Sequence, residues 1–266
     1  MKKTLMVPAV IGMSILLFNA CSKTPPTTGQ HVAPQEFISS TALTITAGHA
    51  TGTGIHTVFT ADEEPIKLYV DGASGQYYRI SGKDTLKSEV PTVVFKSDHQ
   101  YRFQIDFRGE DGSSSNEEYL EEGDLMDPEF EGGALIHQFF FVPVATGAVK
   151  PIDQVNDDGD PLLGYVNLEG LPDQGGLHYE YADKSANGAE NLRVGLNGYF
   201  SVKRAGQRFD LVLDLRHGIK DKQLKNYPWY DDRFSKAVND VNAPYGATDF
   251  ATLFHLHVET VEASGL

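Results

Sequence analysis

Hydrophobic and polar residues alternate with a period of two along several stretches of the chain, which is the pattern of strands that bury one face. The clearest stretch covers residues 209–216, where hydrophobic residues 209, 211, 213 and 215 share one side and the charged residues 210, 214 and 216 lie on the other. Residues 42–46, 67–70 and 101–108 alternate in the same way. No window of twelve or more residues carries a hydrophobic stripe with the period of a helix, and only residues 227–242 are expected to form a short one. The pattern therefore predicts an all-β fold.

Turn-forming residues divide these stretches into hairpins. The chain has 26 glycines and 13 prolines, and turns rich in glycine and aspartate recur at residues 71–75, 158–161 and 183–188. A continuous hydrophobic run ends at residue 144, and we place a boundary after it. The sequence predicts two immunoglobulin-like β-sandwich units, over residues 37–147 and 148–266. One larger sandwich is the alternative.

The N-terminus has the layout of a secretory signal. Two lysines precede a hydrophobic run over residues 5–18, which is too short to span a bilayer as a stable helix. Residues 17–21, Leu-Phe-Asn-Ala-Cys, resemble a bacterial lipobox, in which the cysteine is lipidated and becomes the mature N-terminus. Residues 1–20 are therefore predicted to be a lipoprotein signal peptide, and residues 21–36 the lipidated Cys21 with a proline-containing flexible tether. An ordinary secretory signal followed by an accidental cysteine is the alternative.

Charge and cysteine content exclude several classes of protein. The chain has 22 lysines and arginines against 37 aspartates and glutamates, a net charge of -15, which argues against a nucleic-acid partner. Loss of residues 1–20 leaves 20 basic against 37 acidic residues, so membrane attachment is expected through acyl chains on Cys21 rather than a basic patch. Ser22 does not resemble the aspartate that retains lipoproteins in the inner membrane, which favours the outer membrane. The single cysteine excludes a disulfide framework.

An ordered series of short motifs carries a family resemblance. The series comprises residues 43–46, the run 101–107 with the glutamates that follow it, His137-Gln138-Phe139-Phe140-Phe141, the Asn187-Gly188 turn, Leu213-Asp214-Leu215-Arg216-His217 with Lys220 or Lys222, and Thr248-Asp249. In this order the motifs resemble a family of small outer-membrane lipoproteins of Bacteroidota that accompany TonB-dependent receptors and carry the generic label "type 1 periplasmic binding fold superfamily". The resemblance implies an envelope lipoprotein with such a receptor as its partner. It does not imply a periplasmic-binding-protein fold, because that fold needs alternating strands and helices.

Two histidines near the C-terminus are candidate metal ligands. His255 and His257 share one face of a predicted strand, and Glu259 follows them on the same face. Imidazoles at positions i and i+2 supply part of a zinc, iron or copper site, which needs a further ligand from a neighbouring strand. A polar outward face on which histidine is merely tolerated is the alternative interpretation.

A second candidate site combines His137 with the acidic run that precedes it, over residues 110–131. Glu121 and Glu122 in this run supply carboxylates that, together with an imidazole, suit a hard or borderline cation. A hydrated acidic loop explains the same run without a ligand. His217 continues the buried side of its strand, so we expect a hydrogen-bonded residue at the strand's end rather than a ligand.

An aromatic segment offers a third kind of site. Tyr227, Trp229 and Tyr230 stand close to Arg233 in a predicted loop. Exposed, these side chains would stack on a sugar or bind a partner; buried, they would only close the end of the sandwich.

The chain contains no Walker loop, GxSxG elbow or HExxH motif, so we do not expect an enzyme. These observations predict an outer-membrane lipoprotein that binds a divalent metal ion (zinc, iron or copper), haem or a metal chelate and assists its uptake by a TonB-dependent transporter. The alternative is a cell-surface interaction module that binds a glycan or a protein through the aromatic segment.

Overall fold

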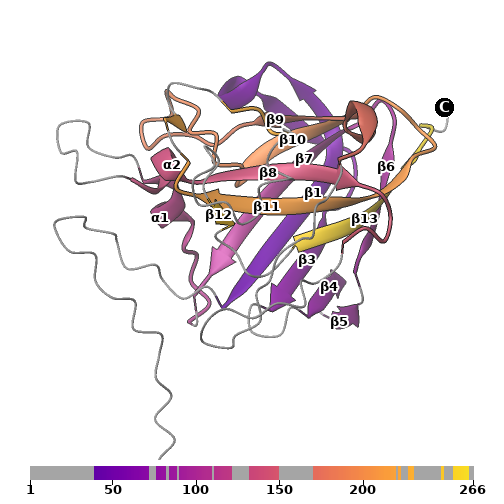
Figure 1. The fold of residues 1–266 in the computed structure, drawn as a ribbon, viewed down its shortest axis with the longest axis horizontal. Helices are drawn as coiled ribbons and strands as arrows, with labels where there is room; N and C mark the ends of the chain where they lie inside the picture. Colours follow the sequence, from indigo (N-terminus) through magenta and orange to yellow (C-terminus); the bar gives the residue numbers. More distant parts are fainter. Residues whose placement is uncertain are drawn as a thin grey trace, which may run out of the picture.

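The structure is a computed structural model that describes residues 39–71, 76–81, 84–88, 90–109, 111–121, 132–149, 170–219, 221–222, 227–230, 247–248 and 254–263. These ranges form β-strands in two sheets with a few short helices, so the prediction of an all-β fold is confirmed (Figure 1). The predicted signal peptide, Cys21, the tether, Glu122 and Arg233 lie outside the described residues. Within the described ranges, no helix is long and apolar enough to cross a membrane.

The larger sheet is antiparallel throughout its described pairs. Its strands lie in the order β5 (Asp84–Ser88), β4 (Tyr77–Ser81), β3 (Ile66–Asp71), β1 (Ser40–Thr51), β7 (Gln100–Arg108), β10 (Asn197–Val202) and β9 (Leu177–Tyr181), and β2 (Val58–Ala61) pairs with the end of β1. β1 pairs with β7 from Ser40 opposite Arg108 to Gly48 opposite Gln100. This long ladder forms the centre of the sheet.

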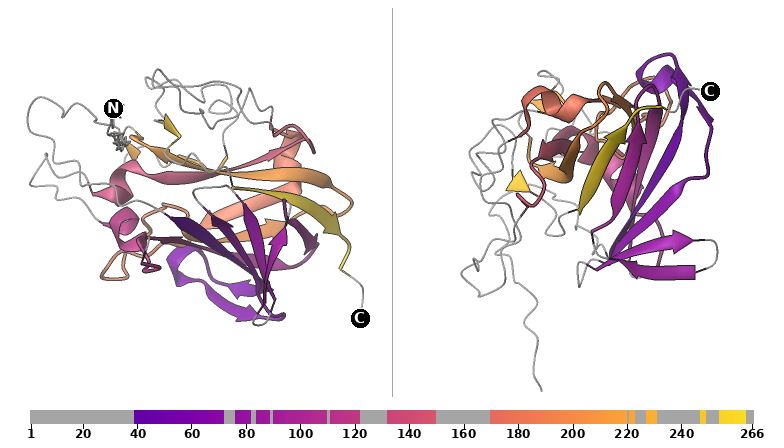
Figure 2. Two further views of the ribbon diagram at one scale, coloured as in Figure 1. Left: turned by 90° about the horizontal axis from the view of Figure 1, so that it is seen from below. Right: turned by 90° about the vertical axis from the view of Figure 1, so that its right-hand side faces the viewer.

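The smaller sheet is built around β11 (Arg208–His217). β8 (Gln138–Val144) pairs along one edge of β11, and β13 (Phe254–Val261) and the short β12 (Ala247–Thr248) pair with β11 as well. β6 (Thr92–Lys96) pairs in parallel with β13. Figure 2 shows the two sheets packed face to face.

Both sheets combine strands from the two sides of residue 147. In the larger sheet, β10 pairs with β7, and in the smaller sheet β13 pairs with β6. The main core also joins the two halves of the chain, with the ring centroids of Phe103 and Phe200 4.7 Å apart. The predicted boundary at residue 147 therefore does not follow the sheets, because strand pairing here is non-local, and the described strands form one sandwich across it.

Aromatic side chains fill the space between the sheets. The ring of Phe200 lies 4.7 Å from that of Tyr179 and 5.2 Å from that of Phe141, in edge or tilted geometries. All three side chains are almost completely buried. The core thus links β8, β9 and β10.

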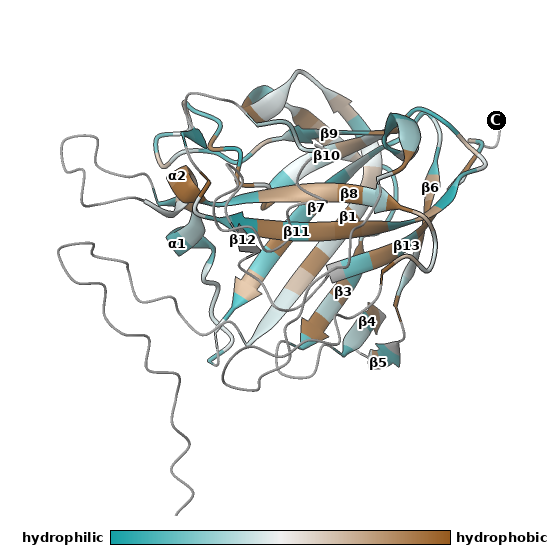
Figure 3. Cartoon of the chain, viewed as in Figure 1, coloured by the Kyte–Doolittle hydropathy of each residue, from teal (hydrophilic) through white to brown (hydrophobic). Residues whose placement is uncertain are grey.

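β8 and β11 bury both of their faces, whereas the alternating sequence of β11 predicted only one buried face. The inward face contributes to the main core, and the outward face carries a second hydrophobic cluster. Figure 3 shows hydrophobic residues along much of β8 and β11. That cluster consists of Phe140, Val142, Val144, Val212, Ile219 and Tyr227. Asp214 and Arg216, on the outward face, are buried as an ion pair with 2.6 Å between Arg216 Nε and Asp214 Oδ2. Asp210, Asp214 and Arg216 of β11 are thus internal, which a period-two pattern does not indicate, whereas Arg208 at the start of the strand is exposed.

Short helices lie at one end of the sandwich. α1 (Asn116–Leu120) follows β7, and α2 (Gly133–Ile136) precedes β8 and packs against α1 (Figure 1). Gly133 permits this approach, because a Cβ atom there would lie 2.1 Å from the carbonyl oxygen of Glu118. Two 3₁₀ helices, η1 (Gly54–His56) and η2 (Pro172–Gly176), connect strands elsewhere. Of the helix expected over 227–242, residues 227–230 are not helical and the remainder lies outside the described ranges.

Candidate functional site

The structure places the predicted metal ligands in two separate regions. His255 and His257 lie on the outward face of β13, as the alternation predicted, and their ring centroids are 5.9 Å apart. Glu259 instead pairs with Arg208 on β11, with Oε1 and Nε 3.0 Å apart. His137 belongs to the other region, beside α2.

His257 is held by a buried carboxylate that the sequence analysis did not single out. Asp210 lies opposite His257 in the β11–β13 register, and its Oδ1 atom is 2.5 Å from His257 Nδ1. The other oxygen of Asp210 accepts a hydrogen bond from the backbone N–H of Gly147 at 2.9 Å. Because Asp210 is 1% exposed, this contact fixes the orientation of a half-exposed imidazole.

His255 is enclosed more fully than His257. Its backbone N–H donates to the hydroxyl of Tyr77 at 3.1 Å, and its ring lies edge-on to the Tyr77 ring at 6.1 Å. Burial lowers the pKa of His255 and raises the pKa of Tyr77 to about 12. The two imidazoles of β13 therefore differ in environment, one facing a phenol and the other a carboxylate.

The second region brings together two histidines that are 80 residues apart in the sequence. His137 Nε2 lies 2.9 Å from His217 Nδ1, and the ring centroids are 4.6 Å apart. His137 precedes β8, whereas His217 ends β11 beside it in the sheet. His217 is thus a hydrogen-bonded residue at a strand end, as expected, but its partner is the histidine that the sequence analysis had selected as a metal ligand.

A backbone contact orients the His137 ring. His137 is 6% exposed and caps the C-terminus of α2, where its Nδ1 atom donates to the carbonyl oxygen of Gly133 at 2.9 Å. With Nδ1 as the donor, the neutral imidazole carries its lone pair on Nε2, the atom that faces His217.

A buried lysine supports the same segment. Lys222 Nζ donates to the carbonyl oxygens of Ala134, His137 and Leu192 at 2.7, 2.6 and 2.9 Å. Burial lowers the pKa of Lys222 to about 7, against the opposing effect of Asp183. The three hydrogen bonds fix the backbone on both sides of the α2–β8 junction. In the sequence, Lys222 stood out only as a member of the motif series behind the family resemblance, with no role assigned to it.

The buried carboxylate of Asp183 interacts electrostatically with Lys222. It is 0% exposed, and its two oxygens accept hydrogen bonds from the backbone N–H groups of Gly195 and Asn197 at 2.6 and 2.7 Å. Burial raises its pKa to about 6, while these hydrogen bonds and Lys222 act in the opposite direction. The sequence of residues 183–188 predicts only a turn and gives no sign that Asp183 is buried.

α1 brings part of the acidic run next to His137. The ring of Tyr119 lies 4.9 Å from the His137 ring in an edge-on arrangement. The carbonyl oxygen of Glu121 accepts a hydrogen bond from the N–H of Ala134 at 3.0 Å, and Glu121 itself is exposed. The backbone of Glu121 therefore lies beside α2, which ends at His137. Among the described residues, no contact between the Glu121 carboxylate and an imidazole is observed.

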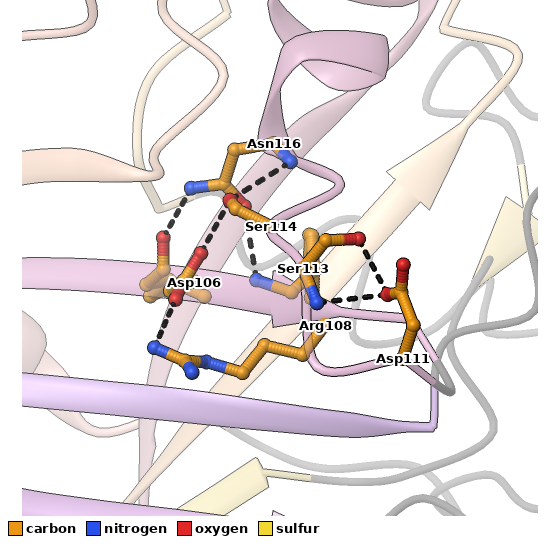
Figure 4. A network of polar contacts seen from close by, with 8 residues as sticks. Asp106, Arg108, Asp111, Ser113, Ser114 and Asn116 are labelled. Carbon is orange, nitrogen blue, oxygen red and sulfur yellow. Dashed lines mark hydrogen bonds and ion pairs between the residues drawn. The ribbon is translucent and has the colours of Figure 1, made fainter.

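The loop at the beginning of the acidic run is held by its own polar contacts (Figure 4). Arg108 pairs with Asp106 at 2.8 Å, and the hydroxyl of Ser114 donates to the same carboxylate at 2.5 Å. Asp111 accepts hydrogen bonds from the N–H and hydroxyl of Ser113 at 2.8 and 2.6 Å, which lower its pKa. The carboxylates of Asp106 and Asp111 thus serve the loop rather than a shared site.

The aromatic segment is mostly buried. Tyr227 and Trp229 are 6% and 8% exposed, and Tyr230 is half-buried. The carbonyl oxygen of Trp229 accepts a hydrogen bond from the N–H of Phe141 at 3.0 Å, so the segment runs beside β8. The exposed stacking surface that binding of a sugar requires is therefore not formed by Tyr227 and Trp229.

Within the described ranges, no group of three or more His, Cys, Asp or Glu side chains is arranged to hold a metal ion. The two histidine pairs above each supply two imidazoles. Comparison with known proteins adds no family: no family model matches the chain, and no curated protein or solved structure is significantly similar to it. The resemblance to the Bacteroidota lipoproteins therefore stays a prediction.

Proposed function

We propose that this chain is a lipid-anchored envelope protein that binds a divalent transition-metal ion, or its chelate, at His137 and His217. The observation that carries the proposal is the 2.9 Å separation of His137 Nε2 and His217 Nδ1. Two nitrogens that bind one ion at about 2.0–2.1 Å lie about 3 Å apart when they occupy neighbouring coordination positions. A hydrogen bond between the rings has the same length, so the experiment must separate the two.

The surroundings of His137 favour the metal interpretation. Gly133 fixes the lone pair of His137 on Nε2, which is the arrangement in which a second contact prepares a histidine for coordination. His217 would give up its Nδ1 proton, so affinity for the ion should fall as the solution becomes acidic. Glu117 and Glu118 lie in the first turn of the neighbouring helix α1. They add negative charge to this end of the molecule.

The rest of the coordination sphere is left to water, to a chelating molecule or to carboxylates of the acidic run. Imidazole ligands suit zinc, copper and iron. Neighbouring positions on one ion do not suit a haem held by two axial histidines, because axial ligands lie on opposite sides of the porphyrin. Among the ligands expected from the sequence, a metal ion or chelate is thus favoured over haem.

The cellular setting of this proposal comes from the sequence. Cys21 would carry the acyl chains, and a TonB-dependent receptor in the outer membrane would be the partner that receives the ion. Detergent-phase partition of the protein expressed in a lipoprotein-processing host tests the anchor: loss of partition in Cys21→Ser supports it, and unchanged partition contradicts it.

Metal-dependent stability tests the site. The full chain without a histidine tag, with Cys21→Ser to remove the thiol, is melted with and without Zn²⁺ or Cu²⁺. An ion that binds only the folded protein stabilises it by about 2.7 kcal/mol at a hundredfold excess over Kd. We expect this stabilisation to be smaller in His217→Gln than in the parent and unchanged in His56→Ala, which removes an exposed histidine of η1. Equal stabilisation of His217→Gln and the parent would leave only the hydrogen-bonded pair.

A further inference from the structure

A third pair of histidines meets at the rim of the sandwich, away from the ligands predicted by sequence. His49 lies near the end of β1, and His99 immediately precedes β7. Gly48 is the partner of Gln100 in the β1–β7 ladder, so His49 and His99 follow as the next pair in the same register. Cross-strand pairs of this kind project side chains from the same face.

The two residues continue the inward side of their strands beyond the end of the core. Ala47 and Tyr101, two positions back towards the core on each strand, are buried. The side chain of His49 is 65% exposed, and His99 is half-buried. Two imidazoles that share a face and have access to solvent leave room for water molecules or a small chelate.

Each ring has one nitrogen engaged with an oxygen atom. His49 Nδ1 lies 2.5 Å from Asp62 Oδ2, and His99 Nδ1 lies 3.3 Å from the carbonyl oxygen of Ser97. An imidazole that donates from Nδ1 in its neutral form carries its lone pair on Nε2. Both rings are thus prepared in the same tautomer, and the carboxylate beside His49 makes that imidazole a stronger ligand.

The distance between the rings suits one shared ion. The centroids of His49 and His99 are 5.5 Å apart, with 43° between the ring planes. For an ion at about 2.0–2.1 Å from each Nε2, tetrahedral geometry places the two centroids about 5 Å apart. The observed separation of the two rings is therefore close to that of a chelating pair.

The local charge is favourable for a cation. Asp62 stands beside His49, and Asp98 is exposed immediately before His99. The one basic residue of the neighbouring turn for which a contact is observed, Lys96, is paired with Glu63. The rim therefore combines two imidazole donors with a net excess of carboxylates.

We propose that His49 and His99 form a transition-metal site of their own, selective for Cu²⁺, Zn²⁺ or Ni²⁺ over the hard cations Ca²⁺ and Mg²⁺. Two imidazole nitrogens bind the ion, water or a small chelate completes its coordination, and Asp62 orients His49. Cu²⁺ is the tightest-binding of these ions at a nitrogen site. The site is separate from the His137–His217 pair and does not depend on it.

Counting bound Cu²⁺ tests the proposal. Equilibrium dialysis of the untagged full chain carrying Cys21→Ser gives the number of ions per chain. We expect His49→Ala and His99→Ala each to bind one ion fewer than the parent, while His56→Ala, which removes an exposed histidine outside the pair, keeps the parent number. An unchanged number in both single variants would overturn the proposal.

Two further measurements distinguish binding at His49 and His99 from a loss of folding and from binding at the His137–His217 pair. Asp62→Asn keeps both imidazoles and should weaken Cu²⁺ binding about tenfold, as expected for a group that orients a ligand; an unchanged affinity would overturn the role of Asp62. In the His217→Gln background, electron paramagnetic resonance should still detect Cu²⁺ with two nitrogen ligands, and that signal should vanish when His99→Ala is added. If the Cu²⁺ signal persists in the double variant, the ion is bound elsewhere and the proposal fails. This outcome does not depend on whether His137 and His217 bind an ion.

Discussion

His137 Nε2 and His217 Nδ1 lie 2.9 Å apart although 80 residues separate the two histidines in the sequence. The contact joins the start of β8 to the end of β11, two strands that pair from Asp210 opposite Val144 to Arg216 opposite Gln138. Sheet formation therefore brings the imidazoles together, and the capping contact from His137 to Gly133 sets the direction of one ring. Strand pairing and the Gly133 contact together hold the two rings beside each other.

The three carbonyl oxygens around Lys222 form a cage that should be essential for stability. Lys222→Met leaves the carbonyl oxygens of Ala134, His137 and Leu192 without this donor. It also leaves Asp183 without its nearby positive charge. Removal of one partner from a buried charged arrangement costs about 3–5 kcal/mol. Urea unfolding of Lys222→Met measures the loss, with Lys184→Met, which removes an exposed lysine, as the control. A loss equal to that of the control would refute the structural role of the cage.

Asp183 should make the folded state less stable as pH rises between about 4 and 6. Burial raises its pKa from 3.8 to about 6, so in this interval the folded protein binds a proton that the unfolded chain has released. The stabilisation from this group is complete below the unfolded pKa and is lost as pH rises through the folded one. The shift of about two units corresponds to about 3 kcal/mol.

Comparing unfolding free energies of the parent and Asp183→Asn across this pH range isolates the contribution of Asp183. The variant will be less stable at every pH, because an amide cannot accept from both Gly195 and Asn197 as the carboxylate does. Its disadvantage should nevertheless shrink as pH rises from 4 to 6. A constant difference between the two proteins would show that the carboxyl group titrates normally.

Trp229 should contribute to stability rather than to a binding surface. It is 8% exposed and belongs to the main core, with its ring 6.1 Å from that of Phe200. Trp229→Ala should cost about 3–5 kcal/mol, the range for truncation of a large buried aromatic side chain. Thermal or urea unfolding measures this cost, and Pro228→Ala, which changes the exposed neighbour, should be close to neutral. A stable Trp229→Ala that has lost a glycan or protein partner would restore the alternative function.

Much of the fold follows from local patterns. Alternation along residues 42–46 and 101–108 located β1 and β7, and the same rule placed His255 and His257 together on one face of β13. Side chains of a strand point alternately to its two sides whatever the strand pairs with. This is why the shared face of these two histidines could be predicted without the fold.

The arrangement of the strands required the tertiary structure. Residues on either side of residue 147 enter the same sheets, because β10 and β13 pair with strands that precede this position. A local pattern indicates a strand but does not identify its partner. The division into two units followed only from the length of the chain and the end of a hydrophobic run.

The sequence by itself determined the strand-rich class of this protein, the shared face of the β13 histidines and the choice of His137 as a candidate ligand. Only the tertiary structure decided that His217 is its neighbour, that Asp210 orients His257, and that the aromatic segment is buried. The physical reason is that period and composition report on the two faces of one strand. Which distant groups meet, and which charged residues of β11 become internal, depends on the packing of layers that are far apart in the chain.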